Sequence, residues 1–260
     1  MPDAPRTMIV TGASSGIGAA LSRLAADEGY RLLVVARRAS RLEALVQAIR
    51  ERGGTAVLLA GNVTAAAMPE QIVRTAADAF GRIDVVVNNA GAGTFGSLLD
   101  QTDAEIEAQW QLNAAAPLRI ARAAVGYLEA VHGQLVFLGS GAARVPLPQY
   151  GAYAAAKAAI RAAAIQLRRE LRGRGISVTY VDPGLVDTEF HTSIGIARSK
   201  EVRATDPQRV AQRILRGIAR RAAVVNGVPW QTAGTVLGEW FGTLADPVIV
   251  SRFSARRTSP

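Results

Sequence analysis

Two residues of this 260-residue chain, Tyr153 and Lys157, have the types and the spacing of an acid–base pair. They are four residues apart in a segment that is predicted to be helical, so both side chains lie on one face, one turn apart. A tyrosine ordinarily has a pKa of about 10, and a nearby ammonium favours the phenolate and lowers that pKa. We therefore expect Tyr153 to exchange a proton near neutral pH. The spacing alone occurs by chance on many helices, but Lys157 is one of only two lysines among 30 basic residues.

A glycine-rich turn lies near the start of the chain, where residues 11–18 read TGASSGIG. Gly12 permits a sharp turn, Gly16 lets the backbone approach a pyrophosphate, and Gly18 permits close packing of helix on strand. The helix that follows offers free N–H groups and a positive dipole end to phosphate. Such a turn can be purely structural, but here a strand precedes it and a helix follows it, as dinucleotide binding requires. The residues of this turn that we expect at the cofactor are Gly12, Ser14, Ser15, Ile17 and Gly18.

The end of the second predicted strand bears on the choice of cofactor. An NAD site has Asp or Glu there to accept a hydrogen bond from the ribose 2′-hydroxyl. This chain instead has Ala36 followed by Arg37 and Arg38. Two guanidinium groups suit a 2′-phosphate, whereas the alternative is a solvated start of a helix. We expect NADP(H) as the cofactor, with Arg37 setting the preference.

The elements that must position these residues follow from the hydrophobic pattern. Strands are expected at residues 8–10, 32–36, 55–59, 83–87, 135–138, 176–181 and 222–225, and helices at 17–28, 40–52, 69–80, 104–111, 114–131, 150–172 and 207–220. Apolar strands alternating with helices predict an α/β fold, a doubly wound Rossmann-type parallel sheet with helices on both faces. No repeat or linker interrupts residues 1–260, so we expect a single domain. Residues 188–205 are expected to form a substrate lid, and 229–260 a C-terminal extension.

Composition excludes several classes of site. The chain has no Cys and only two His, which excludes disulfides and a Cys nucleophile and argues against any metal site. No secretory signal and no apolar run long enough for a transmembrane segment is apparent, so we expect a cytoplasmic protein.

The net charge of +9 is uneven, with −1 in residues 1–140 and +10 in residues 141–260. The simpler interpretation is an Arg-rich solvated surface; the functional one is attraction of an anionic or carrier-linked substrate, in part by Arg198, Lys200 and Arg203. Nucleic-acid binding is not expected, because no nucleic-acid-binding motif accompanies the charge.

Further motifs appear in a characteristic order. Residues 88–91 read NNAG after the fourth strand, and Asn113, Ser140 and the pair Pro183-Gly184 with Thr188 follow. Each has an ordinary structural explanation, but their joint occurrence with the glycine-rich turn and the Tyr–Lys pair is very improbable by accident. Over nearly its whole length the chain resembles the classical short-chain dehydrogenase/reductase family.

The resemblance implies a role for each residue. Tyr153 would donate a proton in reduction and accept one in oxidation, while Lys157 would lower its pKa and bond the nicotinamide ribose. Ser140 would hydrogen-bond the substrate oxygen, and Asn113 would hold a water that extends the proton path. The remaining cofactor contacts implied are Asn62, Val63, Asn89, Ala90 and Gly91 on the adenosine side, and Pro183, Gly184 and Thr188 near the nicotinamide.

Three positions depart from the family pattern: Asn62 replaces a frequent Asp, Ala156 a frequent Ser, and Gly139 a frequent Ser. None removes a catalytic atom. The expected activity is interconversion of a small-molecule carbonyl and a secondary alcohol by hydride transfer; the alternative is a non-catalytic NADP(H)-binding regulatory protein.

The substrate itself is not indicated. The variable region, residues 189–205 and 230–253, is expected to shape its pocket, although its aromatic residues could equally be core or subunit interface. These apolar residues are Phe190, Ile194, Ile196, Trp230, Trp240 and Phe241. A homodimer or homotetramer is expected by resemblance, since the Ala-rich helices 114–131 and 150–172 permit close packing.

Overall fold

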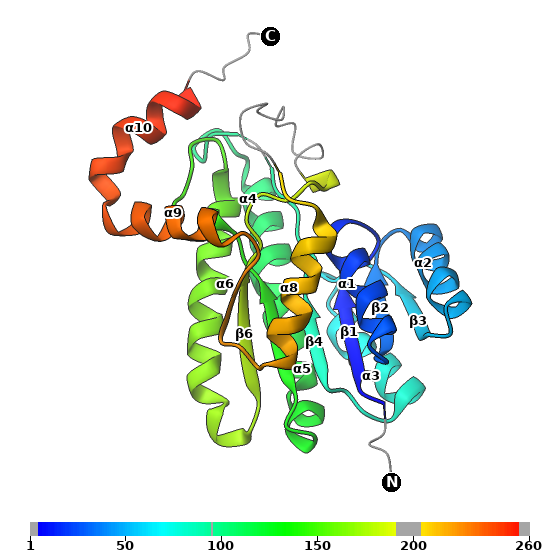
Figure 1. Cartoon of the computed structure of the whole chain (residues 1–260). Helices are drawn as coiled ribbons and strands as arrows, with labels where there is room; N and C mark the ends of the chain where they lie inside the picture. Colours follow the sequence, from blue (N-terminus) through cyan, green and yellow to red (C-terminus); the bar gives the residue numbers. More distant parts are fainter. Residues whose placement is uncertain (1–4, 95, 191–203, 255–260) are drawn as a thin grey trace.

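A computed structural model describes residues 5–94, 96–190 and 204–254 of the chain. Its centre is a seven-stranded sheet in which every neighbouring pair is parallel, in the order β3-β2-β1-β4-β5-β6-β7 (Figure 1). The strands are β1 (Thr7–Thr11), β2 (Arg31–Ala36), β3 (Thr55–Ala60), β4 (Val85–Asn88), β5 (Gln134–Leu138), β6 (Ser177–Asp182) and β7 (Val224–Asn226). The α/β, doubly wound fold expected from the sequence is confirmed.

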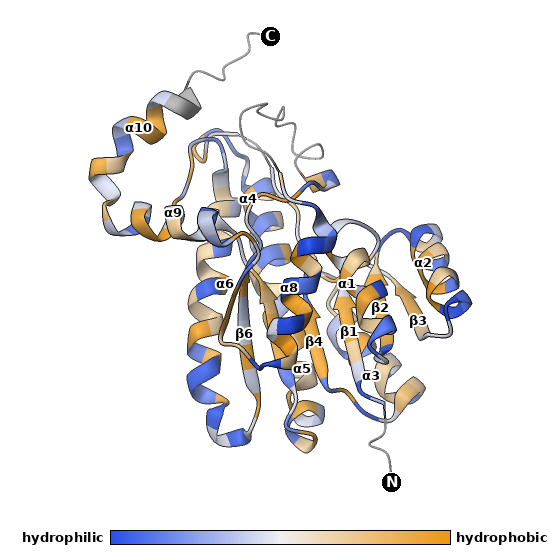
Figure 2. Cartoon of the chain, in the orientation of Figure 1, coloured by the Kyte–Doolittle hydropathy of each residue, from blue (hydrophilic) through white to orange (hydrophobic). Residues whose placement is uncertain are grey.

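Helices cover both faces of this sheet (Figure 1). One face carries α1 (Gly16–Asp27), α2 (Ala39–Glu51) and α8 (Pro207–Ala219), and the other carries α3 (Met68–Phe80), α5 (Ala116–Ala130) and α6 (Gly151–Glu170). The two-sided burial explains why the central strands are continuous apolar runs rather than alternating ones (Figure 2).

Side chains of β1 show how the sheet divides the core into two layers. Met8 and Val10 pack with the first set of helices, while Ile9 packs with the second, because successive strand residues point to opposite faces. All three side chains are fully buried. The layers hold the carboxyl ends of β1 and β4 side by side, at the point where the strand order reverses. Open α/β sheets bind their ligands in the crevice at such a switch point.

The helices expected at 104–111 and 114–131 are joined rather than separate. A capping box of Thr102 and Glu105 starts α4 (Asp103–Trp110), which runs through a π-helical turn (Gln111–Ala115) directly into α5. A π-turn inserts one residue into the helical repeat and is frequent at functional sites. It contains Asn113.

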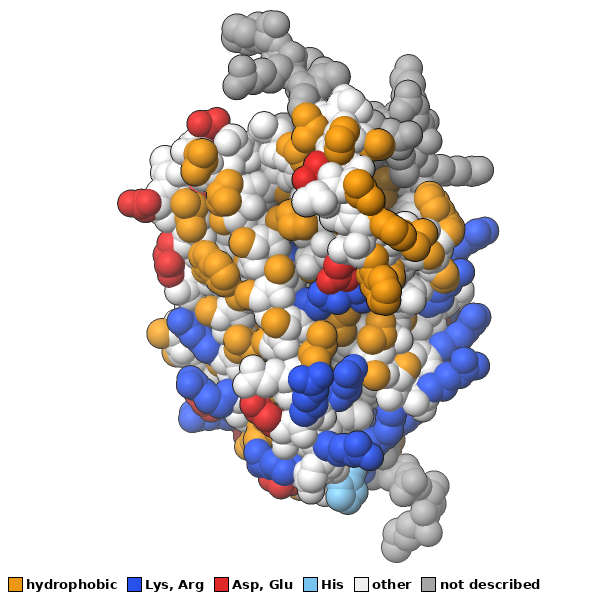
Figure 3. Space-filling model, turned by 90° about the vertical axis from the view of Figure 1, so that its left-hand side faces the viewer, with side chains coloured by type: hydrophobic (Ala, Val, Ile, Leu, Met, Phe, Trp, Pro, Cys, Tyr) orange, Lys and Arg blue, Asp and Glu red, His pale blue; other side chains and the backbone are white. Residues whose placement is uncertain are grey.

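Two helices occupy the C-terminal extension, for which no element was predicted: α9 (Pro229–Trp240) and α10 (Gly242–Ser254). Seen from their side, apolar side chains gather over these helices and basic ones lie lower on the same face (Figure 3). Trp230, Trp240 and Phe241 are exposed there. These three aromatic residues do not line the cleft described below, whereas Phe190 and, from the same C-terminal region, Gly234 and Ile249 do.

The expected lid is described only at its ends. Thr205 pairs with Val186, and backbone hydrogen bonds join it to Asp187 (2.8 Å) and Leu185 (2.9 Å). Ile194, Ile196, Arg198, Lys200 and Arg203 lie outside the described residues. Within the described ranges, no helix is long and apolar enough to cross a membrane.

Candidate active site

A cleft of about 1660 Å³ opens along the carboxyl ends of the strands, where the doubly wound topology places a binding site. Nearly every residue that the sequence predicted as a catalytic or cofactor contact lines it. The two exceptions are Gly18, which lies beneath the glycine-rich turn, and Asn113, which is fully buried behind the wall. No cluster of three or more potential metal-ligating side chains occurs within the described part of the chain.

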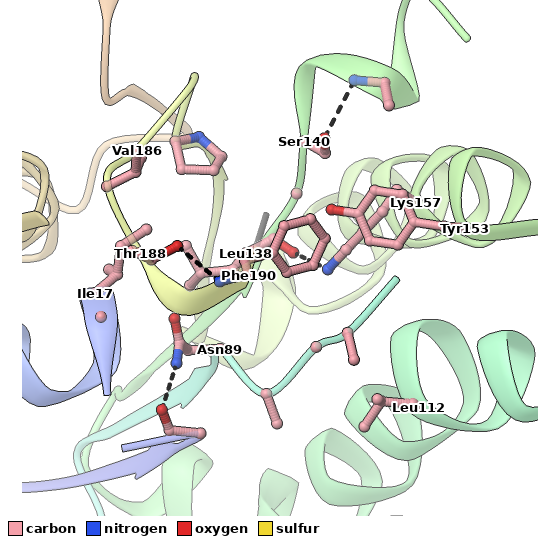
Figure 4. A pocket seen from close by; sticks show the side chains of 18 of the residues that line it. Ile17, Asn89, Leu112, Leu138, Ser140, Tyr153, Lys157, Val186, Thr188 and Phe190 are labelled. Carbon is pink, nitrogen blue, oxygen red and sulfur yellow. Dashed lines mark hydrogen bonds between the residues drawn. The ribbon is translucent and has the colours of Figure 1, made fainter. Parts of the chain in front are cut away.

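The glycine-rich turn packs so closely against neighbouring backbone that two of its glycines have no room for a side chain. Gly12 has φ of +66°, and a Cβ there would lie 2.8 Å from the Ala90 Cα. A Cβ at Gly18 would lie 2.4 Å from the Gly12 carbonyl oxygen. Asn89 supports this arrangement, because its Nδ2 donates to the carbonyl oxygens of Thr11 (2.8 Å) and Gly12 (3.2 Å) (Figure 4). The turn is thus held open toward the cleft, which Asn89 also lines.

Arg38 spans the mouth of this turn. Its Nη2 donates to the hydroxyls of Ser14 (2.9 Å) and Ser15 (2.8 Å), and its Nε also reaches Ser14 (3.1 Å). Its Nη1 pairs at 2.8 Å with Glu189, which Arg41 also pairs. The hydrogen bond from Arg38, followed by that from Arg41, lowers the pKa of Glu189 to about 2. Arg37 lines the same end of the cleft with an exposed side chain.

The segment after β6 closes the opposite wall. Gly184 N–H donates to Asp182 (3.3 Å), and Leu185 N–H donates to Gln231 Oε1 of α9 (2.6 Å). Thr188 lies against the glycine-rich turn, because a Cβ at Gly16 would be 2.8 Å from its Cγ2. Pro183, Gly184 and Thr188 all line the cleft, and their contacts with a nicotinamide stay a prediction.

Tyr153 and Lys157 project from α6 toward the centre of the cleft (Figure 4). Lys157 Nζ lies 5.8 Å from the centroid of the Tyr153 ring and donates to the Leu138 carbonyl oxygen at 2.9 Å. Phe190 covers the Tyr153 ring at 5.3 Å between centroids. The helical spacing thus does bring the two groups together, at the end of β5.

The expectation that Lys157 lowers the pKa of Tyr153 is wrong for this structure. Burial raises the pKa of Tyr153 well above its ordinary value, and the hydrogen bond with Ser140 opposes this only in part. Burial also lowers the pKa of Lys157 to about 8, because desolvation disfavours its charged form. Sequence spacing gives the proximity of two groups but not their desolvation, which dominates here.

Ser140 lies two residues after the end of β5 and is fixed through its backbone as well as its hydroxyl. Its Oγ accepts from Ala142 N–H (3.2 Å), and its N–H donates to Tyr180 Oη (3.3 Å). A Cβ at Gly139 would lie 2.0 Å from that same Tyr180 oxygen. Burial raises the pKa of Tyr180 to about 12, so it stays a neutral phenol. The Tyr180 ring therefore occupies the space that a serine side chain at position 139 would need.

Asn113 is held rigidly by the π-turn. Its Nδ2 donates to the Ala92 carbonyl oxygen (2.8 Å) and to Gln109 Oε1 (2.9 Å), whereas its buried Oδ1 has no hydrogen-bond partner. A Cβ at Gly91 would be 3.0 Å from that Oδ1 and 3.4 Å from Lys157 Nζ. Because Gly91 has no side chain, a gap remains between the unpartnered Asn113 Oδ1 and Lys157 Nζ. A water can bridge two polar groups across such a gap.

Sequence reasoning missed four residues of the site: Gln109, Tyr180, Asp182 and Glu189. Gln109 had a signal, since it lies one helical turn before Asn113. Tyr180 could have been suspected from the unusual Gly139. Asp182 is buried, and desolvation raises its pKa. Nothing in the sequence indicated that Glu189 pairs with Arg38 across 151 residues.

Comparison with known proteins gives a consistent result. The family model described as short chain dehydrogenase matches residues 6–198. A short chain dehydrogenase of Pseudocercospora fijiensis is 35% identical over 189 residues, which are 71% of this chain and 61% of that protein. An 11-beta-hydroxysteroid dehydrogenase-like protein of Arabidopsis thaliana is 31% identical over 233 residues, 87% of this chain and 74% of its own length.

Solved structures also resemble this chain. An alcohol dehydrogenase from Thermococcus sibiricus, complexed with 5-hydroxy-NADP, superposes with a TM-score of 0.77 at 28% identity, covering 85% of this chain and 94% of that one. A protein from Burkholderia phymatum in complex with NAD gives a TM-score of 0.84 over 94% of this chain and 96% of its own, at 20% identity, a level that speaks for the fold alone. These neighbours bind nicotinamide cofactors of both phosphorylation states.

Proposed function

The chain belongs to the short-chain dehydrogenase/reductase family of oxidoreductases, and we propose that it is an NADP(H)-dependent member that interconverts a carbonyl and a secondary alcohol. The observation that carries the proposal is the convergence of Ser140, Tyr153 and Lys157 on one cleft beside the glycine-rich turn. When bound, the nicotinamide cofactor would supply or accept the hydride.

The cleft fits such a cofactor. The turn at Gly12 brings backbone to the cleft surface with no Cβ in the way, and α1 begins there with free N–H groups for phosphate. The Arg38 guanidinium lies over the hydroxyls of Ser14 and Ser15, where it would bind a ribose 2′-phosphate, with Arg37 beside it. Asn62 and Val63 line the same end and would contact the adenine.

The catalytic residues have separate tasks. The Tyr153 hydroxyl would give its proton to the substrate oxygen in reduction and take one back in oxidation. The Ser140 hydroxyl would hydrogen-bond that oxygen and stabilise the developing charge. Lys157 Nζ would bond the cofactor ribose, and the free Asn113 Oδ1 would hold the water that relays protons toward Lys157.

The protonation state of Tyr153 suits a role as proton donor. Burial keeps its pKa high, so at neutral pH it is a phenol with a proton to donate. A group in that state is ready to act as the acid in reduction, whereas oxidation first needs its ionisation.

The test is Tyr153→Phe, which removes the hydroxyl and keeps the ring that packs on Phe190. General acid catalysis is worth roughly 10²–10⁴-fold, so kcat for reduction of a ketone panel with NADPH should fall by at least about 100-fold. Binding of NADPH, followed by its fluorescence, should barely change. Tyr150→Phe is the matched control, because its ring lies 6.3 Å from that of Tyr153 and also lines the cleft. Near-normal turnover by Tyr153→Phe would refute the mechanism.

A further inference from the structure

Helix α4 runs directly into the π-turn that contains Asn113, and it buries a single side chain. Of its residues, all of which the structure describes, Gln109 alone is buried. Burying an amide is unfavourable unless its hydrogen bonds are made, and a leucine would fill the same space without that requirement. A buried glutamine at this position therefore points to a task that an apolar side chain does not perform.

The Gln109 amide is hydrogen-bonded through both of its polar atoms. Its Nε2 donates to the Thr94 hydroxyl (2.9 Å), and its Oε1 accepts from Asn113 Nδ2 (2.9 Å). The backbone carbonyl oxygen of Gln109 accepts from that same Nδ2 at 3.3 Å. Residues four apart on a helix are neighbours on one face, and Gln109 accordingly contacts the Asn113 amide twice, through its side chain and through its backbone.

These bonds determine which way the Asn113 amide faces. Its Nδ2 carries two hydrogens, and the acceptors around it are the Ala92 carbonyl oxygen (2.8 Å) and the two Gln109 oxygens. A flipped amide would place its oxygen against these acceptors, which have no hydrogen to donate. Oδ1 therefore stays near Gly91, where a Cβ would lie 3.0 Å from it and 3.4 Å from Lys157 Nζ.

Thr94 completes this arrangement by fixing the Gln109 amide as well. The Ala92 carbonyl oxygen can only accept, so it holds Asn113 Nδ2 on its own side. Gln109 must then offer its oxygen to Nδ2, and its own Nε2 is left to the Thr94 hydroxyl, which can accept a hydrogen bond. Thr94, Gln109 and Asn113 thus form one chain of hydrogen bonds in which each amide has a single satisfied orientation.

We infer that Gln109 is a positioning residue for the proton path, because it holds the Asn113 amide with Oδ1 toward Lys157. Gln109 does not line the cleft, so it acts only through Asn113. The inference rests on the proposed function, which gives Asn113 the water that relays protons toward Lys157. It adds to that path a residue that lies in none of the sequence motifs.

The first experiment replaces Gln109 by leucine, which keeps the approximate size of the side chain and removes both polar atoms. Loss of one neutral hydrogen bond on Asn113 should lower kcat for ketone reduction by roughly twofold to tenfold, while NADPH affinity stays unchanged. Gln47→Leu is the matched control, because Gln47 is exposed, bonds only Glu51 (2.8 Å) among the described hydrogen bonds and does not line the cleft. An unchanged kcat in Gln109→Leu, or an equal fall in Gln47→Leu, would overturn the inference.

The second experiment asks whether Gln109 acts through Asn113 or by packing alone. Adding Gln109→Leu to Asn113→Ala should lower kcat no further than Asn113→Ala does, because the amide to be positioned is already gone. A packing role would act independently of Asn113. A further fall of roughly twofold to tenfold in the double variant would therefore contradict the inference.

A measurement without substrate separates this inference from the proposed function. In the ¹⁵N-labelled full-length protein, the side-chain amide signal of Asn113 is identified by its loss in Asn113→Ala. Its hydrogens should exchange with solvent at least about twofold faster in Gln109→Leu, since one of their acceptors is removed. Faster exchange in a protein that reduces no ketone leaves Gln109 as the residue that orients Asn113, and only the proposed function fails. Ketone reduction with exchange unchanged in Gln109→Leu refutes the inference and leaves the proposed function standing.

Thr94→Val keeps the inference testable if Gln109→Leu does not fold. Valine has nearly the shape of threonine, and the change removes only the hydroxyl that accepts from Gln109 Nε2. The Gln109 amide is then free to turn, so exchange of the Asn113 amide should again rise and kcat should fall. Exchange and kcat that both match the unchanged protein in Thr94→Val would overturn the inference.

Discussion

Replacing Arg38 by alanine should change which nicotinamide cofactor the protein prefers. Arg38 donates from Nε and Nη2 to Ser14 and Ser15, which places its guanidinium directly over the glycine-rich turn. A hydrogen bond to a charged group contributes about 1.5–3 kcal/mol. The Arg38 side chain is 42% exposed, so solvent screening favours the lower limit. At about 1.4 kcal/mol per tenfold, Arg38→Ala should weaken NADPH binding by about tenfold.

The assay is titration of NADPH and NADH by nucleotide fluorescence at two salt concentrations. NADH lacks the 2′-phosphate, so its affinity should hardly move, and the NADPH effect should shrink as salt rises. Arg52→Ala is the matched control, because Arg52 pairs with Asp27 away from the cleft. Arg37→Ala, the change that the sequence alone favoured, should have a smaller effect than Arg38→Ala. Equal weakening of both cofactors by Arg38→Ala would refute the reasoning.

In the same assay, replacing Glu189 is expected to have the opposite effect on NADPH affinity to replacing Arg38. Its lowered pKa keeps it anionic at neutral pH, and it occupies Arg38 and Arg41. A cofactor 2′-phosphate bound there would therefore compete with this carboxylate for the same guanidinium. Glu189→Gln should bind NADPH more tightly than the unchanged protein and bind NADH equally well; weaker NADPH binding would show that Glu189 positions Arg38 instead of competing for it.

Three further outcomes are expected. Burial lowers the pKa of Lys157 from 10.5 to about 8, so between these pH values the unfolded chain binds more protons at Lys157 than the folded one, and the free energy of unfolding falls as pH falls. Lys157→Met should therefore raise the free energy of unfolding at pH 7 by up to about 3 kcal/mol. Urea titrations should show this gain fading toward pH 10. Tyr180→Phe should lower the free energy of unfolding by about 1 kcal/mol and reduce kcat more than it changes NADPH binding, because it frees the backbone of Ser140. Sedimentation should show a homodimer or homotetramer at micromolar concentration, since α5 exposes Leu118 and Tyr127; a single monomeric species would contradict this.

The sequence predicted the sheet and the order of its elements well because buried parallel strands are continuous apolar runs. It did not predict the π-turn at Asn113, since one inserted residue barely disturbs the apolar spacing of a helix. It also missed α9 and α10. Most of α10 is exposed although many of its residues are apolar, so it has no one-sided stripe by which to recognise a helix.

For the site, spacing predicted which residues meet but not how their surroundings act on them. Tyr153 and Lys157 do lie together, yet burial and not their mutual attraction determines their pKa values. Likewise, Arg37 and Arg38 are indistinguishable in sequence, and only the fold shows that Arg38 reaches Ser14. Proximity along a helix is a property of local geometry, whereas desolvation depends on every element packed around a group.

Gly139 shows how a departure from a family pattern can be misread. In sequence it is a lost serine beside Ser140, and so a lost hydroxyl in the site. In the structure any side chain at 139 would collide with the ring of Tyr180, whose hydroxyl holds the Ser140 backbone instead. The position of Tyr180 therefore depends on Gly139, although the two residues are 41 positions apart in the chain. The substrate oxygen is accordingly expected to meet a Ser140 that is positioned from β6, and replacing Gly139 alone should cost activity even where serine is the common residue.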